Sequence, residues 1–129
     1  MKAIGTNVAL RWLTGDDPAQ VGIARDVLRS PVLIPLTVLM EIIWTLRRTF
    51  RYDRAALNAA ITTLVDLDTV SVAAEAGVRW ALDRHAEGAD LPDMLHLVAS
   101  RGASAFVTFE RRLAEKAGPS APLPVETLA

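Results

Sequence analysis

A short β-branched run between two prolines constrains the fold more than any other feature of this sequence. Residues 32–34, Val-Leu-Ile, lie between Pro31 and Pro35. Such a compact apolar run is typical of a strand that is buried in a parallel sheet. The run therefore predicts a central strand, with helices on either side of it along the chain.

Short apolar segments alternate with helical patterns over the rest of the chain. Asp17 before Pro18 is a typical helix start, Thr37 is expected to cap a helix that runs to about residue 50, and Asp53 is expected to cap the next one. The expected strands are 2–5, 32–34, 68–72 and 105–108, and a surface strand or extended segment is expected over 118–129. The expected helices are 8–13, 18–30, 37–50, 53–65, 73–85 and 92–100. This alternation predicts an α/β fold with a small, mostly parallel sheet flanked by helices, and a single domain over 1–129.

Charge and composition exclude several classes of protein. The 129 residues carry a formal charge of -1, so a globally basic surface for nucleic acid is absent and any such contact must be local. There is no cysteine, which excludes disulfides, thiolate zinc sites and a cysteine nucleophile and is compatible with the cytoplasm. We expect no signal peptide, because Thr6, Asn7 and Arg11 interrupt the apolar run at the start and no small-residue cleavage site follows it. We also expect no membrane span, because the longest apolar stretch, 32–46, is short and contains Pro35 and Glu41.

Glu41 is the most informative residue, because it is the only ionisable group between residues 32 and 46. The positions three and four residues away are threonines, a valine and a tryptophan, so no cation lies within reach on the same helix. The carboxylate therefore needs a partner from elsewhere. Either it serves a functional site, or it is a solvent-facing residue or one paired with a distant arginine such as Arg11 or Arg48.

Three further acids lie where an α/β sheet places functional groups. Asp90 and Asp93 surround a helix start, where they can simply cap the helix, and they can also point toward Glu41 to hold a divalent cation. Glu110 follows the strand expected over 105–108, although it can equally open a charged helix over 110–116.

The two histidines are weaker candidates than these acids. His96 is more typical of a core or supporting residue than of a metal ligand, and His85 is expected on the surface near a helix end. There is no glycine-rich phosphate loop, nucleophile elbow or paired-histidine zinc motif.

Four segments in this order resemble the PIN-domain ribonucleases, and more closely the VapC toxins of bacterial type II toxin–antitoxin systems. The segments are Ala3-Ile-Gly-Thr-Asn-Val, Leu36-Thr-Val-Leu-Met-Glu41, Gly88-Ala-Asp-Leu-Pro-Asp93 and Val107-Thr-Phe-Glu110. The resemblance covers roughly the whole chain. It implies a three-layer PIN-like fold whose clustered carboxylates bind Mg²⁺ or Mn²⁺ and cleave an RNA phosphodiester.

The resemblance also assigns roles to particular residues. It implies that Glu41, Asp93 and Glu110 are catalytic, and that the metal ligands are Glu41, Asp90, Asp93 and Glu110. The polar supporting positions that it implies are Thr6, Asn7, Thr37 and Thr108.

The first motif departs from the family pattern, because Gly5 stands where the family has a metal-binding aspartate. Glycine brings no ligand, and the loss of one anionic oxygen weakens a metal site. We therefore expect an inactive or strongly impaired nuclease, either a natural decayed copy or a deliberately disarmed protein. The alternatives are a catalytically dead binding module that retains the fold to bind antitoxin or RNA, and a structural α/β domain whose acids are caps.

Partners follow from the resemblance: a cognate antitoxin protein, an RNA substrate and a second copy in a homodimer. Large apolar side chains could form such interfaces, although core packing explains them equally well; they are Trp12, Trp44, Phe50 and Tyr52. A basic cluster could contact RNA phosphates or be a solvated helix face; it consists of Arg47, Arg48, Arg51 and Arg54.

Overall fold

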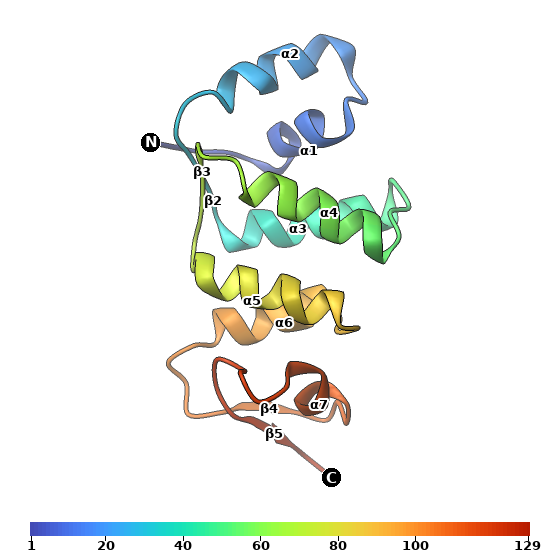
Figure 1. Cartoon of the computed structure of the whole chain (residues 1–129), viewed down its shortest axis with the longest axis vertical. Coiled ribbons are helices and arrows are strands. Elements are labelled where there is room, and N and C mark those ends of the chain that lie inside the picture. Colours follow the sequence, from blue (N-terminus) through green and yellow to red (C-terminus); the bar gives the residue numbers. More distant parts are fainter. The chain divides into compact units, whose positions relative to one another are not determined.

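The computed structural model describes all 129 residues and divides them into two compact units, Met1–Glu75 and Ala76–Ala129. Unit 1 holds β1 (Lys2–Ala3), α1 (Thr6–Thr14), α2 (Pro18–Val27), β2 (Val32–Ile34), α3 (Leu36–Arg48), α4 (Arg54–Val65) and β3 (Val70–Val72) (Figure 1). Unit 2 holds α6 (Leu91–Ala99), β4 (Phe106–Thr108), α7 (Leu113–Ala117), β5 (Val125–Thr127) and all of α5 (Glu75–Ala86) except its first residue. The single domain expected over 1–129 stays a prediction.

The sheet of unit 1 has three parallel strands in the order β1-β2-β3. Val32 pairs with Lys2 on one side and with Val70 on the other, so β2 is the central strand. Val32 and Ile34 are fully buried, as expected for the β-branched run between the two prolines. Because the strands are parallel, their carboxyl ends share one edge of the sheet, and both α1 and α3 begin at that edge.

The helices of unit 1 bury apolar stripes against this sheet and against one another. In α3, the side chains of Leu39, Ile42, Ile43 and Leu46 are completely inaccessible to solvent, which gives the spacing of an amphipathic helix. Helix α4 lies beside α3 and buries a stripe that begins at Leu57 (Figure 1). The core of unit 1 therefore fixes one face of α3 and leaves the opposite face to solvent.

Unit 2 is built from the helices α5, α6 and α7 and from a second sheet of two parallel strands, β4 and β5. Phe106 in β4 pairs with Val125 in β5, so the extended tail predicted over 118–129 contains a strand. Two hydrogen bonds join α5 to the end of the chain: Trp80 Nε1 donates to Ser120 Oγ over 3.0 Å, and Arg84 Nε donates to the Lys116 carbonyl over 2.9 Å.

The α/β class and the parallel pairing of the strands are confirmed, and two local predictions are wrong. Helix α3 begins at Leu36 with Pro35 as its N-cap, so Thr37 lies inside the helix and does not cap it. Proline preorganises this start through its fixed φ. The charged segment after β4 becomes helical only at Leu113, so Glu110 lies before α7 and does not open it. None of the helices has the length and apolar character that a bilayer crossing requires.

Candidate active site

The carboxyl edge of the three-stranded sheet brings the first two sequence motifs together. Gly5 and Thr6 follow β1, and Glu41 lies one and a half turns into α3, which follows β2. The Thr6 hydroxyl Oγ1 donates a hydrogen bond of 2.9 Å to Glu41 Oε1, across 35 residues of sequence. Unit 1 therefore holds the Glu41 carboxylate through the hydroxyl of the residue that follows position 5.

Glu41 forms no ion pair in the structure. Its side chain is exposed, and its one side-chain hydrogen bond is the bond from Thr6. Arg11 lies 3.4 Å from Asp16 and pairs with that carboxylate instead. Arg48 forms no ion pair either, so the interpretation of Glu41 as an arginine-paired residue is wrong. The partner from elsewhere that the sequence required is a neutral hydroxyl, which leaves the negative charge of Glu41 uncompensated.

Gly5 is the N-cap of α1, and its backbone does not require glycine. Its φ of -84° and ψ of 168° are extended values that any residue adopts. A Cβ built at this position would have Asn7 Oδ1 as its nearest neighbour at 3.5 Å, an ordinary van der Waals distance. No side chain caps the helix here. An aspartate would therefore fit at position 5 without strain and could also cap α1.

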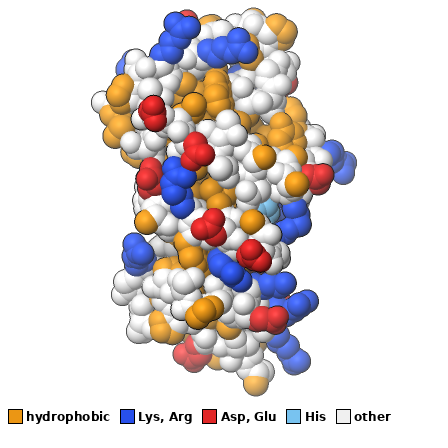
Figure 2. Space-filling view, in the orientation of Figure 1, with side chains coloured by type: hydrophobic (Ala, Val, Ile, Leu, Met, Phe, Trp, Pro, Cys, Tyr) orange, Lys and Arg blue, Asp and Glu red, His pale blue; other side chains and the backbone are white.

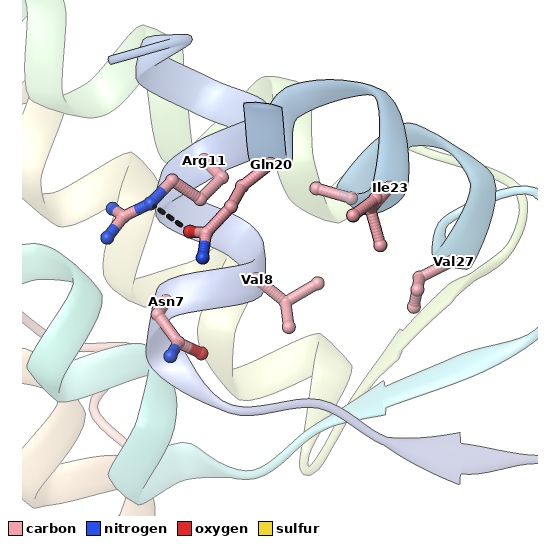
Figure 3. Close-up of a pocket in the computed structure, with 7 residues that line it drawn as sticks. Asn7, Val8, Arg11, Gln20, Ile23 and Val27 are labelled. Atoms are coloured by element: carbon pink, nitrogen blue, oxygen red, sulfur yellow. Dashed lines mark hydrogen bonds between the residues drawn. The ribbon is translucent and has the colours of Figure 1, made fainter. Parts of the chain in front are cut away.

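The other polar positions of unit 1 lie close to this edge. Thr37 is exposed on α3, four residues before Glu41, so the two side chains project from the same side of the helix. Asn7 is exposed and borders a pocket of about 190 Å³ between α1 and α2 (Figure 3). The pocket is lined by Asn7, Val8, Arg11, Gln20, Ile23, Ala24 and Val27. Within it, Arg11 Nε donates to Gln20 Oε1 over 2.7 Å, as the dashed line in Figure 3 shows.

Unit 2 contributes the pair Asp90 and Asp93 at the start of α6. Asp90 is the N-cap, and its Oδ2 accepts a hydrogen bond of 3.1 Å from the Asp93 backbone N–H. Both side chains are half-buried, and each makes contacts beyond this bond. The capping interpretation of Asp90 is therefore confirmed, while the role of this pair as metal ligands stays a prediction.

Glu110 and Thr108 lie together at the end of β4. The Thr108 hydroxyl Oγ1 accepts a hydrogen bond of 2.9 Å from the Glu110 backbone N–H, which fixes the turn after the strand. The Glu110 side chain is exposed. The turn places the acid at the carboxyl end of its strand, as the sequence analysis predicted.

The environments of the two histidines are the reverse of those expected. His85 is only 3% exposed, because it belongs to the buried stripe of α5 that also contains Val78, Ala81 and Leu82. His96 is exposed, because it lies on the opposite side of α6 from Met94, Leu95, Leu97 and Val98. The helical spacing of the apolar residues in α5 and α6 predicts both environments, but the sequence analysis did not use it for the histidines.

The residues present fit a divalent cation only in part. Carboxylate oxygens are the ligands that Mg²⁺ and Mn²⁺ prefer, and Glu41, Asp90, Asp93 and Glu110 supply them. Gly5 supplies none, and within neither unit do three acidic or histidine side chains form a group that could hold a metal. Unit 1 by itself offers one carboxylate at this edge, that of Glu41. The donor set of unit 1 is therefore incomplete, and no catalytic step through a metal follows from it.

The aromatic and basic candidates differ in how exposed their side chains are. Trp44 is 49% exposed, whereas Trp12, Phe50 and Tyr52 are half-buried and belong in part to the packing of unit 1. All four arginines of the basic cluster, Arg47, Arg48, Arg51 and Arg54, are exposed. The sequence analysis overlooked that Glu41, Trp44 and Arg48 are spaced at i, i+3 and i+7, which places them on one side of a helix.

Comparison with protein families identifies the scaffold. The family model of the PIN domain matches residues 3–119, a stretch that includes all four motifs and parts of both units. PIN domains are typically metal-dependent nucleases and generally use divalent metals such as Mg²⁺. A search of the curated proteins found no match. Because the family model covers most of the sequence, this chain belongs to the PIN domain family.

Proposed function

We propose that this chain is a VapC-type toxin built on a metal-dependent ribonuclease scaffold, with RNA cleavage strongly impaired because position 5 lacks a carboxylate. Its partners in this proposal are a cognate antitoxin and a second copy of the chain. The order of the four motifs, three of which carry an acid, supports the toxin branch, and the family supports nuclease chemistry.

One observation carries the proposal: position 5 has room for an acidic side chain next to Thr6, the residue that holds Glu41. Gly5 has an ordinary extended backbone, space for a Cβ and an uncapped helix start. The adjacent residue, Thr6, already holds the carboxylate of Glu41. An aspartate at position 5 would add a second carboxylate to unit 1, one residue from the donor that holds Glu41, and carboxylate oxygens are the ligands that Mg²⁺ and Mn²⁺ prefer.

The experiment restores that carboxylate. Gly5→Asp is compared with Gly5→Asn, which has the same shape and no charge, in RNA cleavage with Mg²⁺ or Mn²⁺. We expect Gly5→Asp to raise the cleavage rate by about 10- to 100-fold or more over the unchanged chain, because the loss of a residue that merely supports a metal ligand already costs about 10- to 100-fold. Glu41→Gln in the Gly5→Asp background should remove the gain. Equal rates for Gly5→Asp and Gly5→Asn would contradict the proposal.

A second candidate function is a binding module that keeps the fold without turnover. The glycine at position 5 favours it, because it leaves unit 1 with a single carboxylate, that of Glu41, at the carboxyl edge of its sheet. A manganese titration of the unchanged chain separates the two candidates. An impaired nuclease should still bind Mn²⁺ weakly and lose that binding in Glu41→Gln, whereas a pure binding module need not bind Mn²⁺ at all.

A further inference from the structure

The exposed face of α3 carries its side chains at the spacing by which two helices pack along their length. Four exposed residues follow one another at steps of four, three and four: Thr37, Glu41, Trp44 and Arg48. Such alternating steps keep side chains on one side of a helix, where they form the seam of a helix pair. Trp44 is 49% exposed despite its size. We call these four residues the α3 seam.

The α3 seam has an unpaired acid at one position and an unpaired cation seven residues further on. Glu41 Oε1 accepts the bond from Thr6, and Glu41 Oε2 accepts none. Arg48 is exposed and forms no ion pair. A cavity of about 340 Å³ beside it is lined by Trp44, Arg47 and Arg48. The seam therefore offers a carboxylate and, on the same helix, a hollow lined by guanidinium groups.

A second copy of α3, turned antiparallel by a two-fold axis, brings the acid of one copy to the hollow of the other. An axis midway between residues 44 and 45 sets residue 41 of one helix opposite residue 48 of its partner. Glu41 then lies over the hollow between Trp44, Arg47 and Arg48 of the second copy, as a knob enters the hole between residues of a facing helix. The contact occurs twice, because a two-fold interface joins one patch to itself.

The same arrangement keeps like charges apart. A helix rises about 1.5 Å per residue, so the two copies of Arg48 lie about 10 Å from each other along the helix axis, as do the two copies of Glu41. This is about one Debye length at 0.1 M salt, so the repulsion is screened, whereas the opposite charges are in contact. Charge complementarity therefore favours a second copy as the occupant of this face.

Net charge does not oppose this association. The chain as a whole carries a formal charge of -1, and Figure 2 shows acidic and basic side chains interspersed on the face in view. A large net charge of one sign would keep two copies apart, and this chain has none.

We propose that the chain forms an antiparallel dimer through the α3 seam, in which Arg48 of each copy binds the Glu41 carboxylate of the other and masks it. Thr6 donates to Glu41 Oε1, and Arg48 of the second copy donates to Oε2. Both carboxylate oxygens are then occupied and the negative charge is compensated, so the acid is withheld from other ligands. Trp44 lies next to the two-fold axis, where the two rings bury apolar surface.

This inference rests on the proposed function, which includes a second copy of the chain, and names its contact face and its effect on the site. Helix α3 has 13 residues, and such a helix is about 20 Å long and 10 Å wide. That face is smaller than the about 800 Å² per partner of a standard interface. We therefore expect a weak, reversible dimer with a micromolar dissociation constant, which masks Glu41 at high chain concentration and frees it on dilution.

The test exchanges charges between the two copies. Sedimentation velocity of the full chain in EDTA measures the dimer from low to high micromolar concentration. Glu41→Arg and Arg48→Glu should each weaken the dimer by about 5-fold or more, because both symmetric ion pairs become repulsive. An equimolar mixture of the two variants should dimerise again, since opposite charges face each other in the mixed dimer. The double variant Glu41→Arg/Arg48→Glu should also dimerise.

A control variant and a ring deletion complete this series. Arg25→Glu makes the same change of charge as Arg48→Glu at an exposed position on α2, and it should dimerise like the unchanged chain. Trp44→Ala should weaken the dimer by about 30-fold or more, the loss typical of a central tryptophan. Circular dichroism verifies that each variant is folded.

Cross-linking tests the pairing of Glu41 with position 48 itself. Arg48→Lys keeps the positive charge and introduces an amine, which a carbodiimide joins to a carboxylate in contact with it. An amide bond forms, and the carbodiimide takes up the released water and leaves as a urea. Mixing ¹⁴N- and ¹⁵N-labelled chains distinguishes links between copies from links within one copy. We expect mixed-isotope peptides that join Glu41 to position 48, and none with Glu41→Gln in the same background.

Several results would overturn the inference. These are a chain that stays monomeric at every concentration, a mixture of the two charge variants that does not dimerise, and equal losses in Arg25→Glu and Arg48→Glu. A dimer that Arg48→Glu leaves unchanged would place the contact on another face. A monomeric chain whose RNA affinity falls in Arg48→Glu would assign the seam to nucleic acid.

The outcome is also separable from that of the proposed function. If Gly5→Asp gains cleavage and the mixture of charge variants does not dimerise, the masked dimer is wrong and the nuclease proposal stands. If the mixture dimerises and Gly5→Asp gains no cleavage, the nuclease proposal is wrong and the α3 seam stands as a dimer interface.

Discussion

Substitutions at Gly5 test by stability alone whether this position is an open place for a carboxylate. The backbone there is extended, and the nearest atom to an added Cβ is 3.5 Å away. Replacing glycine by a residue that fits the native backbone stabilises a protein by about 0.4–1 kcal/mol through the unfolded state. An Asn or Asp cap adds a few tenths of a kcal/mol over glycine. We therefore expect Gly5→Asn to raise the free energy of unfolding by about 1 kcal/mol.

Gly5→Asp should be less stabilising than Gly5→Asn, because it adds a negative charge next to Thr6, the residue that holds the uncompensated carboxylate of Glu41. Two like charges roughly 6 Å apart in water repel by about 0.7 kcal/mol. A favourable interaction with the start of α1 offsets part of this repulsion. Without metal, we therefore expect a gain of about 0.5 kcal/mol or less for Gly5→Asp.

Manganese should reverse this order. A ligand that binds only the folded protein stabilises it by about 2.7 kcal/mol when its concentration is 100 times its Kd. A second carboxylate, supplied by Gly5→Asp, should raise the affinity of this site for Mn²⁺. Urea unfolding followed by circular dichroism, with EDTA or with millimolar MnCl₂, measures both effects. If Gly5→Asn lowers stability, the position is not open as described. If Gly5→Asp and Gly5→Asn have equal stabilities under both conditions, position 5 does not act with Glu41.

Further predictions concern the helices that position the site. Gly77→Ala should destabilise the protein by about 1 kcal/mol or more in urea unfolding, because the new Cβ would lie 2.5 Å from the Val98 side chain and overpacking outweighs the gain in helix propensity. A Cβ added at Gly22 has no neighbour within 4 Å, so Gly22→Ala should raise the free energy of unfolding by about 0.5–1 kcal/mol. If Gly77→Ala and Gly22→Ala changed the stability in the same direction, the close packing of Gly77 on Val98 would be refuted. Asp90→Ala should cost about 1 kcal/mol through loss of the bond to the Asp93 N–H, whereas Asp90→Asn should retain the cap; equal losses would contradict the capping role.

The elements could be predicted from the sequence because local chemistry specifies them. The run 32–34 between prolines became the central strand, and Asp17, Asp53 and Asp90 became N-caps that accept backbone hydrogen bonds. Thr37 failed as a cap because the helix begins immediately after Pro35, before the threonine can flank it.

The environment of individual polar side chains was harder to predict. The partner of Glu41 is Thr6, and a contact across 35 residues leaves no trace in local spacing. The exposure of His85 and His96 could have been predicted from the apolar stripes of their helices, because burial follows the helical period. The four motifs could be recognised by their order, but the fit of an aspartate at Gly5 required the backbone angles and the space around it.

The most direct test of the missing carboxylate is a pair of crystals, one of the unchanged chain and one of Gly5→Asp, both grown with MnCl₂ and measured for anomalous scattering. A missing ligand at position 5 predicts a strong manganese peak at the Glu41 carboxylate in Gly5→Asp, and a weak peak or none in the unchanged chain. Peaks of equal height in both crystals, or no peak at Glu41 in Gly5→Asp, would contradict it.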